Sequence, residues 1–167
     1  MTAAVRIARP GDGAAILRVW LDTAAYHAEL DHEHFKMPVT DDFAERTDEV
    51  FDRSGDDVLN LVAEMDGRVV GWLSARVARP DPDAAAQFVR EHDWTRLIVD
   101  ALIVDRQQWR QGTGAKLLES AEAWGHARGA QVVRLDTWAD SPVSIPFYEQ
   151  HMGYQRRSIV FQMRLRS

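Results

Sequence analysis

The most informative part of the sequence is Leu102-Ile103-Val104, followed after a short loop by Arg110-Gln111-Gly112-Thr113-Gly114-Ala115. Its first part closes an apolar run that begins at Leu97, and such a run is typical of a strand covered on both faces. Its second part is a Gly-x-Gly turn that opens residues 113–128, where apolar side chains recur at helical spacing before a stop at Gly129. The sequence therefore predicts a buried strand, a glycine turn and an amphipathic helix in succession.

A glycine turn at the start of a helix is suited to binding an anion. The first N–H groups of the helix lack internal acceptors and carry the positive end of its dipole. Glycine lets the backbone approach a phosphate closely, and Arg106 and Arg110 can add charge-assisted contacts. Leu117 replaces the third glycine of a dinucleotide fingerprint, and the Gly-Lys-Ser/Thr of a triphosphate loop is absent. NAD and ATP are thus disfavoured, which leaves another pyrophosphate ligand or a purely structural turn.

The rest of the chain reads as a single domain over residues 1–167 with a mixed α/β layout. Asp66-Gly67 predicts a hairpin turn, and Asp12 and Asp83 are the expected helix caps. Further strands are expected at residues 5–8, 59–65, 68–77, 132–135 and 158–165. Further helices are expected after Asp12 and at residues 42–53, 84–90 and 147–151, with a polar loop at 27–42.

Composition narrows the class of function. The 167 residues carry a net charge of −6 and no cysteine, which excludes a disulfide framework and a cysteine nucleophile. No run approaches the roughly 20 apolar residues of a membrane span, and the N-terminus lacks the apolar core of a signal peptide, so we expect a cytoplasmic protein without a membrane partner. The acidic first 60 residues argue against nucleic acid and suit a cationic acceptor, although ordinary surface charge is the alternative.

Two blocks of sequence resemble the signatures of the GNAT superfamily of N-acetyltransferases. Residues 102–118 resemble its acetyl-CoA-binding motif. Ser141-Pro142-Val143-Ser144-Ile145-Pro146-Phe147-Tyr148-Glu149, followed by Gly153-Tyr154, resembles its second signature, a short helix leading into a Gly-aromatic strand start. The order of elements also matches, so the resemblance covers essentially the whole chain. It implies a GNAT-like mixed central β-sheet flanked by helices on both faces.

The resemblance also implies a set of cofactor contacts. The backbone at 102–104 would pair with the pantetheine arm of acetyl-CoA, and the amides from Gln111 to Ala115 would hold the pyrophosphate. The implied cofactor residues are Leu102, Ile103, Val104, Arg110, Gln111, Gly112, Thr113, Gly114, Ala115, Ser141 and Ser144. This sequence departs from the family pattern in having Trp109 in place of Arg or Gln, Ser141 in place of Asn, and five residues instead of four from Tyr148 to Gly153.

Two residues are candidates for acid–base chemistry. Asp100 interrupts an apolar run, where a charge is costly unless it is paired or functional. It would relay a proton from the acceptor ammonium, of pKa ~10, through a water, or else pair with a neighbouring strand or Arg. Tyr148 stands where the family has the tyrosine that protonates the departing thiolate, the alternative being a packing aromatic. A backbone N–H at the end of the 102–104 strand would meet the oxyanion.

The acceptor site is expected between the first two helices, the 27–42 loop and the 79–93 insertion. Its predicted lining is Tyr26, Glu29, Asp31, Phe35 and Trp72. The histidines of this loop lack a metal-ligand spacing, so no metal is expected. We therefore predict an acetyl-CoA-dependent N-acetyltransferase whose acceptor, a primary amine of a small molecule or peptide, attacks directly. The alternatives are an acyl-CoA sensor without turnover and an enzyme for a longer acyl-CoA; a homodimer is compatible with the sequence, but no residue decides it.

Overall fold

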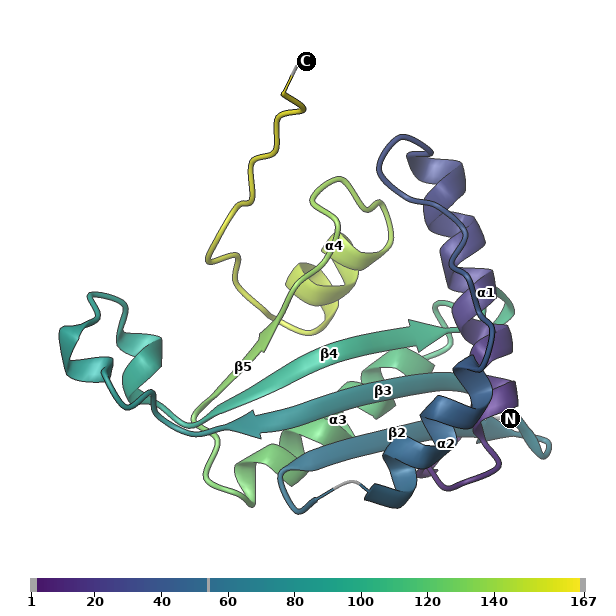
Figure 1. The fold of residues 1–167 in the computed structure, drawn as a ribbon, viewed down its shortest axis with the longest axis horizontal. Coiled ribbons are helices and arrows are strands. Elements are labelled where there is room, and N and C mark those ends of the chain that lie inside the picture. The colour runs from purple at the N-terminus through teal and green to yellow at the C-terminus, as the bar shows by residue number, and fades with distance from the viewer. Residues whose placement is uncertain (1–2, 54, 166–167) are drawn as a thin grey trace. The chain divides into compact units, whose positions relative to one another are not determined.

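A five-stranded sheet in the order β1-β2-β3-β4-β5 organises the first of the two units into which the chain divides, Met1–Leu135 and Asp136–Ser167 (Figure 1). The computed structural model describes residues 3–53 and 55–165. The first unit contains, in chain order, β1 (Ala4–Ile7), α1 (Gly13–Leu30), α2 (Phe43–Arg53), β2 (Val58–Met65), β3 (Arg68–Ala78), the 3₁₀ turns η1 (Ala84–Ala86) and η2 (Arg90–Asp93), β4 (Arg96–Val104), the 3₁₀ turn η3 (Arg106–Gln108), α3 (Thr113–His126) and β5 (Val132–Leu135).

The sheet is mixed because β1 to β4 pair antiparallel and β5 joins β4 in parallel. The predicted hairpin between β2 and β3 is confirmed, with Met65 opposite Arg68. Asp66 and Gly67 have φ angles of 52° and 76°, which a two-residue hairpin turn of the I′ type requires at both positions.

Helices cover both faces of the sheet, as the sequence predicted (Figure 1). On one face, a Cβ added to Gly71 of β3 would lie 3.0 Å from Leu117 of α3, so this glycine permits the close approach of helix and strand. On the other face, Val62 of β2 packs in a buried cluster with Ile16 of α1, against which Phe43 of α2 is partly buried. The sheet therefore lies between α3 on one face and α1 and α2 on the other.

A β-bulge and a short fifth strand open one edge of β4. Ser74 pairs with Ala101 but Ala75 pairs with Val99, so Asp100 is the extra residue of the bulge. The pairing of β4 with β5 ends where Val99 pairs with Leu135, the last residue of β5. Among the strands described, none pairs with this edge of β4 from Ala101 to Val104.

The second unit contains α4 (Ser144–Pro146), the π-helical turn η4 (Phe147–His151) and an extended segment after Gly153. The strand predicted at 158–165 is wrong for the single chain, because these residues have no regular structure and Phe161 is 91% exposed. The alternating pattern is present, but a strand is stable only when its backbone groups find a partner strand.

Other differences from the prediction are local. α1 continues to Leu30, so residues 27–30 belong to the helix and not to the loop. The helix expected at 84–90 is replaced by the two 3₁₀ turns, and neither Asp12 nor Asp83 caps a helix with its side chain. The carboxylate of Asp12 instead accepts hydrogen bonds from the Arg6 guanidinium, at 2.7 and 2.9 Å, and from the backbone N–H of Arg9.

Candidate active site

The turn before α3 has the geometry of an anion cradle. Gly112 has φ of 82°, and no heavy atom lies within 4 Å of the position that a Cβ would occupy there. The first bond of the helix runs from the Lys116 N–H to the Gly112 carbonyl at 3.0 Å, so the three preceding amides, those of residues 113–115, have no intrahelical acceptor. Arg110 is exposed and also has a positive φ of 61°. This arrangement leaves backbone donors and a cation beside open space.

The open edge of β4 lies directly before this turn. The Asp105 N–H donates to Val70 of the β3 side at 2.9 Å. Because successive residues of a strand direct their backbone groups to opposite sides, those of Ile103 face β3, whereas those of Leu102 and Val104 face the open edge. The Val104 carbonyl already accepts a hydrogen bond from the Trp109 indole at 2.7 Å. Of the predicted pantetheine contacts, the Leu102 backbone and the Val104 N–H therefore face the open edge.

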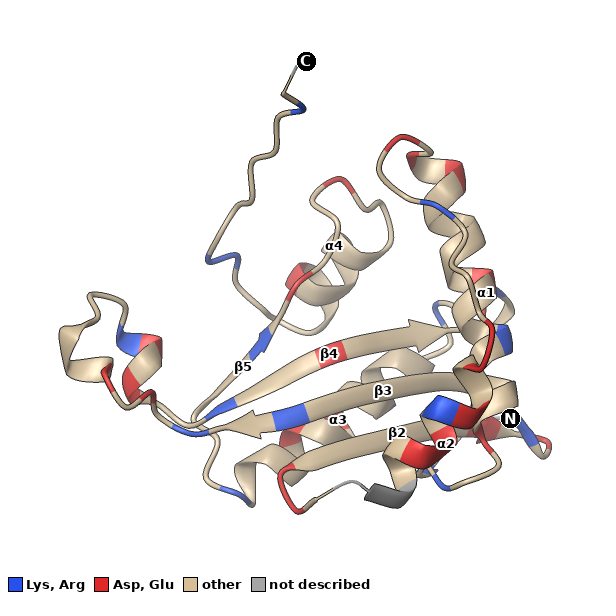
Figure 2. Cartoon of the chain, in the orientation of Figure 1, with Lys and Arg blue, Asp and Glu red and all other residues tan. Residues whose placement is uncertain are grey.

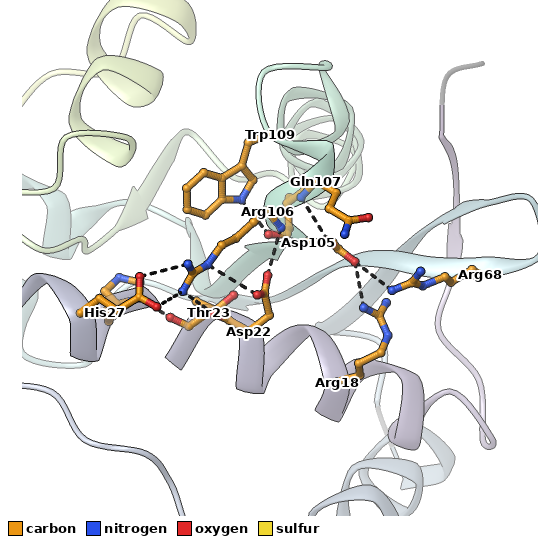
Figure 3. Close-up of polar contacts among 11 residues, drawn as sticks. Arg18, Asp22, Thr23, His27, Arg68, Asp105, Arg106, Gln107 and Trp109 are labelled. Carbon is orange, nitrogen blue, oxygen red and sulfur yellow. Dashed lines mark hydrogen bonds and ion pairs between the residues drawn. The ribbon is translucent and has the colours of Figure 1, made fainter. Parts of the chain in front are cut away.

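Arg106 joins this turn to the C-terminal half of α1 (Figure 3). Its backbone N–H donates to Asp22 at 3.0 Å and its guanidinium donates to Glu29 at 3.1 Å. The guanidinium also lies 5.1 Å from the ring centre of Tyr26, which stacks edge-on against Trp109 at 4.8 Å. The sequence suggested Arg106 as a phosphate contact, but two carboxylates already neutralise its charge. Arg106 instead ties the loop between β4 and α3 to α1.

Asp105, which no sequence motif indicated, anchors the same loop at the end of β4. Its carboxylate is buried and pairs with Arg18 of α1 at 2.8 Å and with Arg68 of β3 at 3.4 Å. Burial acts to raise the pKa of Asp105, but the hydrogen bonds from Arg18 and the Gln107 N–H outweigh it and hold the pKa below its usual value. The sequence does place Asp105 directly after a buried strand, and a charged residue at that position indicates a possible anchoring or functional role.

Asp100 projects from the bulge on the face of the sheet opposite α3. Its carboxylate lies 3.1 Å from Nε of Arg76 on β3 and is 43% exposed. The structure thus contains the arginine partner that was one of the two alternatives for Asp100. The other, a relay to the acceptor, stays a prediction, since the carboxylate is accessible to a solute.

The residues predicted to line the acceptor site fall into separate groups. Tyr26 and Glu29 belong to the Arg106 cluster, whereas Asp31 and Phe35 shape the loop after α1. Asp31 accepts the N–H groups of Glu33 and His34, and Phe35 contacts the ring of His27 at 4.9 Å. Trp72 is partly buried on β3, and its indole N–H is buried with no hydrogen-bond partner.

The second unit carries the remaining predicted residues. Ser141 is buried, and its hydroxyl oxygen accepts the N–H of Ser144, the first residue of α4, at 3.0 Å; Tyr148 lies in the π turn that follows α4. The bond from the Met152 N–H to Phe147, at 3.0 Å, spans five residues and makes this turn π-helical. The π turn accommodates the extra residue between Tyr148 and Gly153. Gly153 has a φ of 75°, and the helical turn ends before it. Burial raises the pKa of the Tyr148 phenol to about 12.

Charge and composition of the described residues limit the chemistry of the site. Figure 2 shows acidic side chains along α1, α2 and the loop after α1. No group of three or more acidic or histidine side chains in residues 3–53 and 55–165 is arranged to hold a metal ion. Over the same residues, no helix has the length and apolarity to cross a bilayer.

Comparisons with known proteins agree with this architecture. The sequence profile of the acetyltransferase (GNAT) family matches residues 14–154. A mutant of the BH1408 protein from Bacillus halodurans superposes with a TM-score of 0.81 at 15% identity, over 97% of this chain and 99% of that one. An acetyltransferase from Trypanosoma brucei gives 0.64 at 19% identity, over 98% and 99%. AAC(6')-Iy, in complex with the bisubstrate analogue CoA-S-monomethyl-acetylneamine, gives 0.68 at 17% identity over 100% of both chains. At these identities the likeness is one of fold.

Proposed function

Because the chain belongs to the acetyltransferase (GNAT) family, we propose that it transfers an acetyl group from acetyl-CoA to a primary amine of a small molecule or peptide. The observation that carries the proposal is the open edge of β4 leading into the glycine turn. An extended amide-bearing arm fits a free strand edge, and a pyrophosphate fits the amides at a helix N-terminus. Both features occur within a few residues of each other in the first unit.

The residues present fit a CoA thioester. The amides of residues 113–115 would hold the pyrophosphate, and the empty space in front of Gly112 leaves room for it. The exposed Arg110 would add positive charge. The Trp109 indole already donates to the Val104 carbonyl, so this carbonyl would not be available to the pantetheine arm. When bound, acetyl-CoA supplies an acyl group activated as a thioester. We infer that residues 1–167 act as one domain, since the family match over residues 14–154 spans both units.

Direct attack needs an uncharged amine and a proton for the leaving thiolate. Asp100, at the bulge where the β4 edge opens and 3.1 Å from Nε of Arg76, would take the ammonium proton through a water. The Tyr148 phenol, kept protonated by its pKa of about 12, would donate to the sulfur. A free backbone N–H at the β4 edge would meet the developing oxyanion.

The acceptor is expected to be cationic before it reacts. Acidic side chains dominate α1, α2 and the loop after α1, which favours a positively charged solute at this side (Figure 2). A structure of similar fold, an aminoglycoside acetyltransferase from a soil metagenomic sample, is in complex with sisomicin. Polyamine-like small molecules are therefore the first acceptors to test.

Calorimetric titration with acetyl-CoA, CoA, NADH and ATP tests the cofactor site. We expect only the two CoA species to bind. Gly112→Val should weaken CoA binding at least tenfold, because the side chain both enters the cradle and disfavours the left-handed backbone.

Gly129→Val is the matched control, since Gly129 has φ of 84° with open space around it but lies at the other end of α3. Gly129→Val should have the same backbone strain at a positive φ as Gly112→Val, but it should retain CoA affinity. Equal loss in both variants, or no CoA binding by the parent chain, would contradict the cofactor site. CoA binding without thiol release in the presence of any amine would favour the sensing module, and a preference for longer acyl-CoA would favour the alternative donor.

A further inference from the structure

Arg76 and Asp100 form an ion pair on the sheet face that α1 and α2 partly cover. Gly71 of β3 faces α3, whereas Trp72 packs against the buried cluster that includes Ile16 of α1. Because side chains alternate along a strand, Arg76 lies on the same face as Trp72. Asp100 projects from the bulge on this face, 3.1 Å from Nε of Arg76. The pair therefore lies on the side expected to receive the acceptor, where the edge of β4 opens.

This pair adds little to the stability of the fold. The side chains of Arg76 and Asp100 are 52% and 43% exposed. An exposed ion pair contributes little because water screens both charges and two long side chains lose freedom. A bulge, in contrast, re-aims a side chain and is frequent next to active sites. A role in binding a solute therefore accounts for the pair better than a role in stability.

The contact uses only one atom of each side chain. Nε of Arg76 faces Oδ2 of Asp100, and the described residues supply no further partner for the two Nη atoms of Arg76 or for Oδ1 of Asp100. A guanidinium presents its donors in a planar fork that matches a carboxylate. A carboxylate oxygen in turn accepts hydrogen bonds from an ammonium group. The pair thus offers a position for an anion and a position for a cation on neighbouring strands, which lie ~4.8 Å apart.

We propose that the acceptor is a free α-amino acid, whose carboxylate binds the Nη atoms of Arg76 and whose ammonium faces Oδ1 of Asp100. This inference rests on the proposed acetyl transfer and names its substrate class. The two charged groups of an α-amino acid are attached to one carbon, so they lie as close together as the two positions of the site.

The transfer step places each bond and proton. The ammonium first loses one proton to solvent through the water at Asp100. The amine then forms a bond to the acetyl carbon, and the C–S bond of the thioester breaks. The nitrogen loses its second proton, which balances the proton gained by the CoA thiolate. The product is an N-acetylamino acid whose carboxylate is unchanged, so Arg76 would hold the same group before and after the reaction.

Calorimetry with the protein saturated with free CoA tests the site without turnover. L-Arginine, L-argininamide and agmatine share a cationic side chain and one reactive primary amine, but only L-arginine has the carboxylate. L-Arginine should bind at least tenfold more tightly than the other two compounds. Arg76→Gln should abolish this preference, and Arg76→Lys should retain part of it because the positive charge remains. Equal binding of the three compounds by the parent protein would overturn the proposal.

Arg134→Gln is the matched control variant. Arg76 and Arg134 both pair in register with Ile98, so the two arginines lie on the same face of the sheet. The side chain of Arg134 is 45% exposed and is also paired with a carboxylate, that of Glu91 at 2.7 Å. Arg134→Gln should leave the preference for L-arginine unchanged. An equal loss in both variants would mean that the general charge of this face attracts the carboxylate, and the site would be wrong.

Thiol release from acetyl-CoA separates this inference from the proposed function. Each standard L-amino acid with a primary amine is compared with its amide, and the acid should have a kcat/KM at least ten times higher. If the amides or agmatine react as well as the acids, the acetyl transfer stands and the amino-acid site is overturned. If none of these amines releases thiol, the proposed transfer itself fails.

Circular dichroism of each variant checks that it is folded.

Discussion

Tyr148 shows how a local environment changes the chemistry expected of a residue type. A free phenol of pKa ~10 is close to a thiol of pKa ~8.5, but loss of solvation raises the pKa of the partly buried Tyr148 to about 12. At neutral pH it is fully protonated and can donate a hydrogen bond to the sulfur, although a complete proton transfer to a thiolate is uphill. Its ring lies among aromatic neighbours, 5.0 Å from Phe147 and 6.0 Å from Tyr154, which accounts for the loss of solvation.

Tyr148→Phe should lower kcat by about 100-fold, because it removes a hydrogen-bond donor to the charge that develops on the sulfur, and should leave CoA affinity unchanged. In an ultraviolet titration of the three tyrosines, this variant should lack the ionisation near pH 12. Tyr154→Phe serves as the aromatic control and should keep most of the activity. An unchanged kcat in Tyr148→Phe would mean that water supplies the proton.

At the scale of elements, the loop from β4 to α3 is held from two sides. Arg106 ties it to α1 through Asp22 and Glu29, and Asp105 ties it to Arg18 and Arg68 (Figure 3). These contacts connect the helix expected to face the acceptor with the turn expected to hold the cofactor. The sequence showed the turn, but it contained no signal that an arginine beside the turn would serve α1 instead of a phosphate.

Arg106→Ala should reduce the free energy of unfolding by on the order of 1–3 kcal/mol, because it leaves two carboxylates without their cationic partner. It should also raise KM for the acceptor more than KM for acetyl-CoA. Arg110→Ala is the matched comparison and should weaken CoA binding, with less effect at high salt, while leaving stability to urea nearly unchanged. The reverse result would show that Arg106 contacts the cofactor directly.

For the whole molecule, buried or paired carboxylates make stability depend on pH. The ion pair with Arg6 holds the pKa of Asp12 below its usual value, as Arg18 and Gln107 do for Asp105 against the effect of burial. A lowered pKa in the folded state contributes stability above the unfolded pKa of ~3.9, and this contribution is lost as the pH falls through the folded value. Tyr148 makes stability fall at high pH instead. Its phenol ionises near pH ~10 in the unfolded chain but at a higher pH in the folded one, so the folded state loses stability as the pH rises above ~10.

Thermal unfolding measured from pH 7 down to pH 2 should therefore show a fall in Tm that begins near pH 4. Asp12→Asn should have a lower Tm at pH 7 and a shallower fall, because it removes one of the titrating contacts. Asp41→Asn, a change at an exposed site, should retain the parent slope. If Asp12→Asn kept the full slope, the Arg6–Asp12 pair would not contribute to stability.

Sequence patterns alone predict the strand–turn–helix at residues 102–128, the β2–β3 hairpin and the family, because hydrophobic period, glycine position and turn chemistry are properties of neighbouring residues. The tertiary structure decided the bulge at Asp100, the pairing of Asp100 with Arg76, and the use of Arg106 and Trp109 within the loop. It also decided that residues 158–165 form no strand within one chain. These outcomes depend on partners distant in the sequence, and the energy of a strand edge, an ion pair or a buried hydrogen bond is set by the partner that folding brings to it.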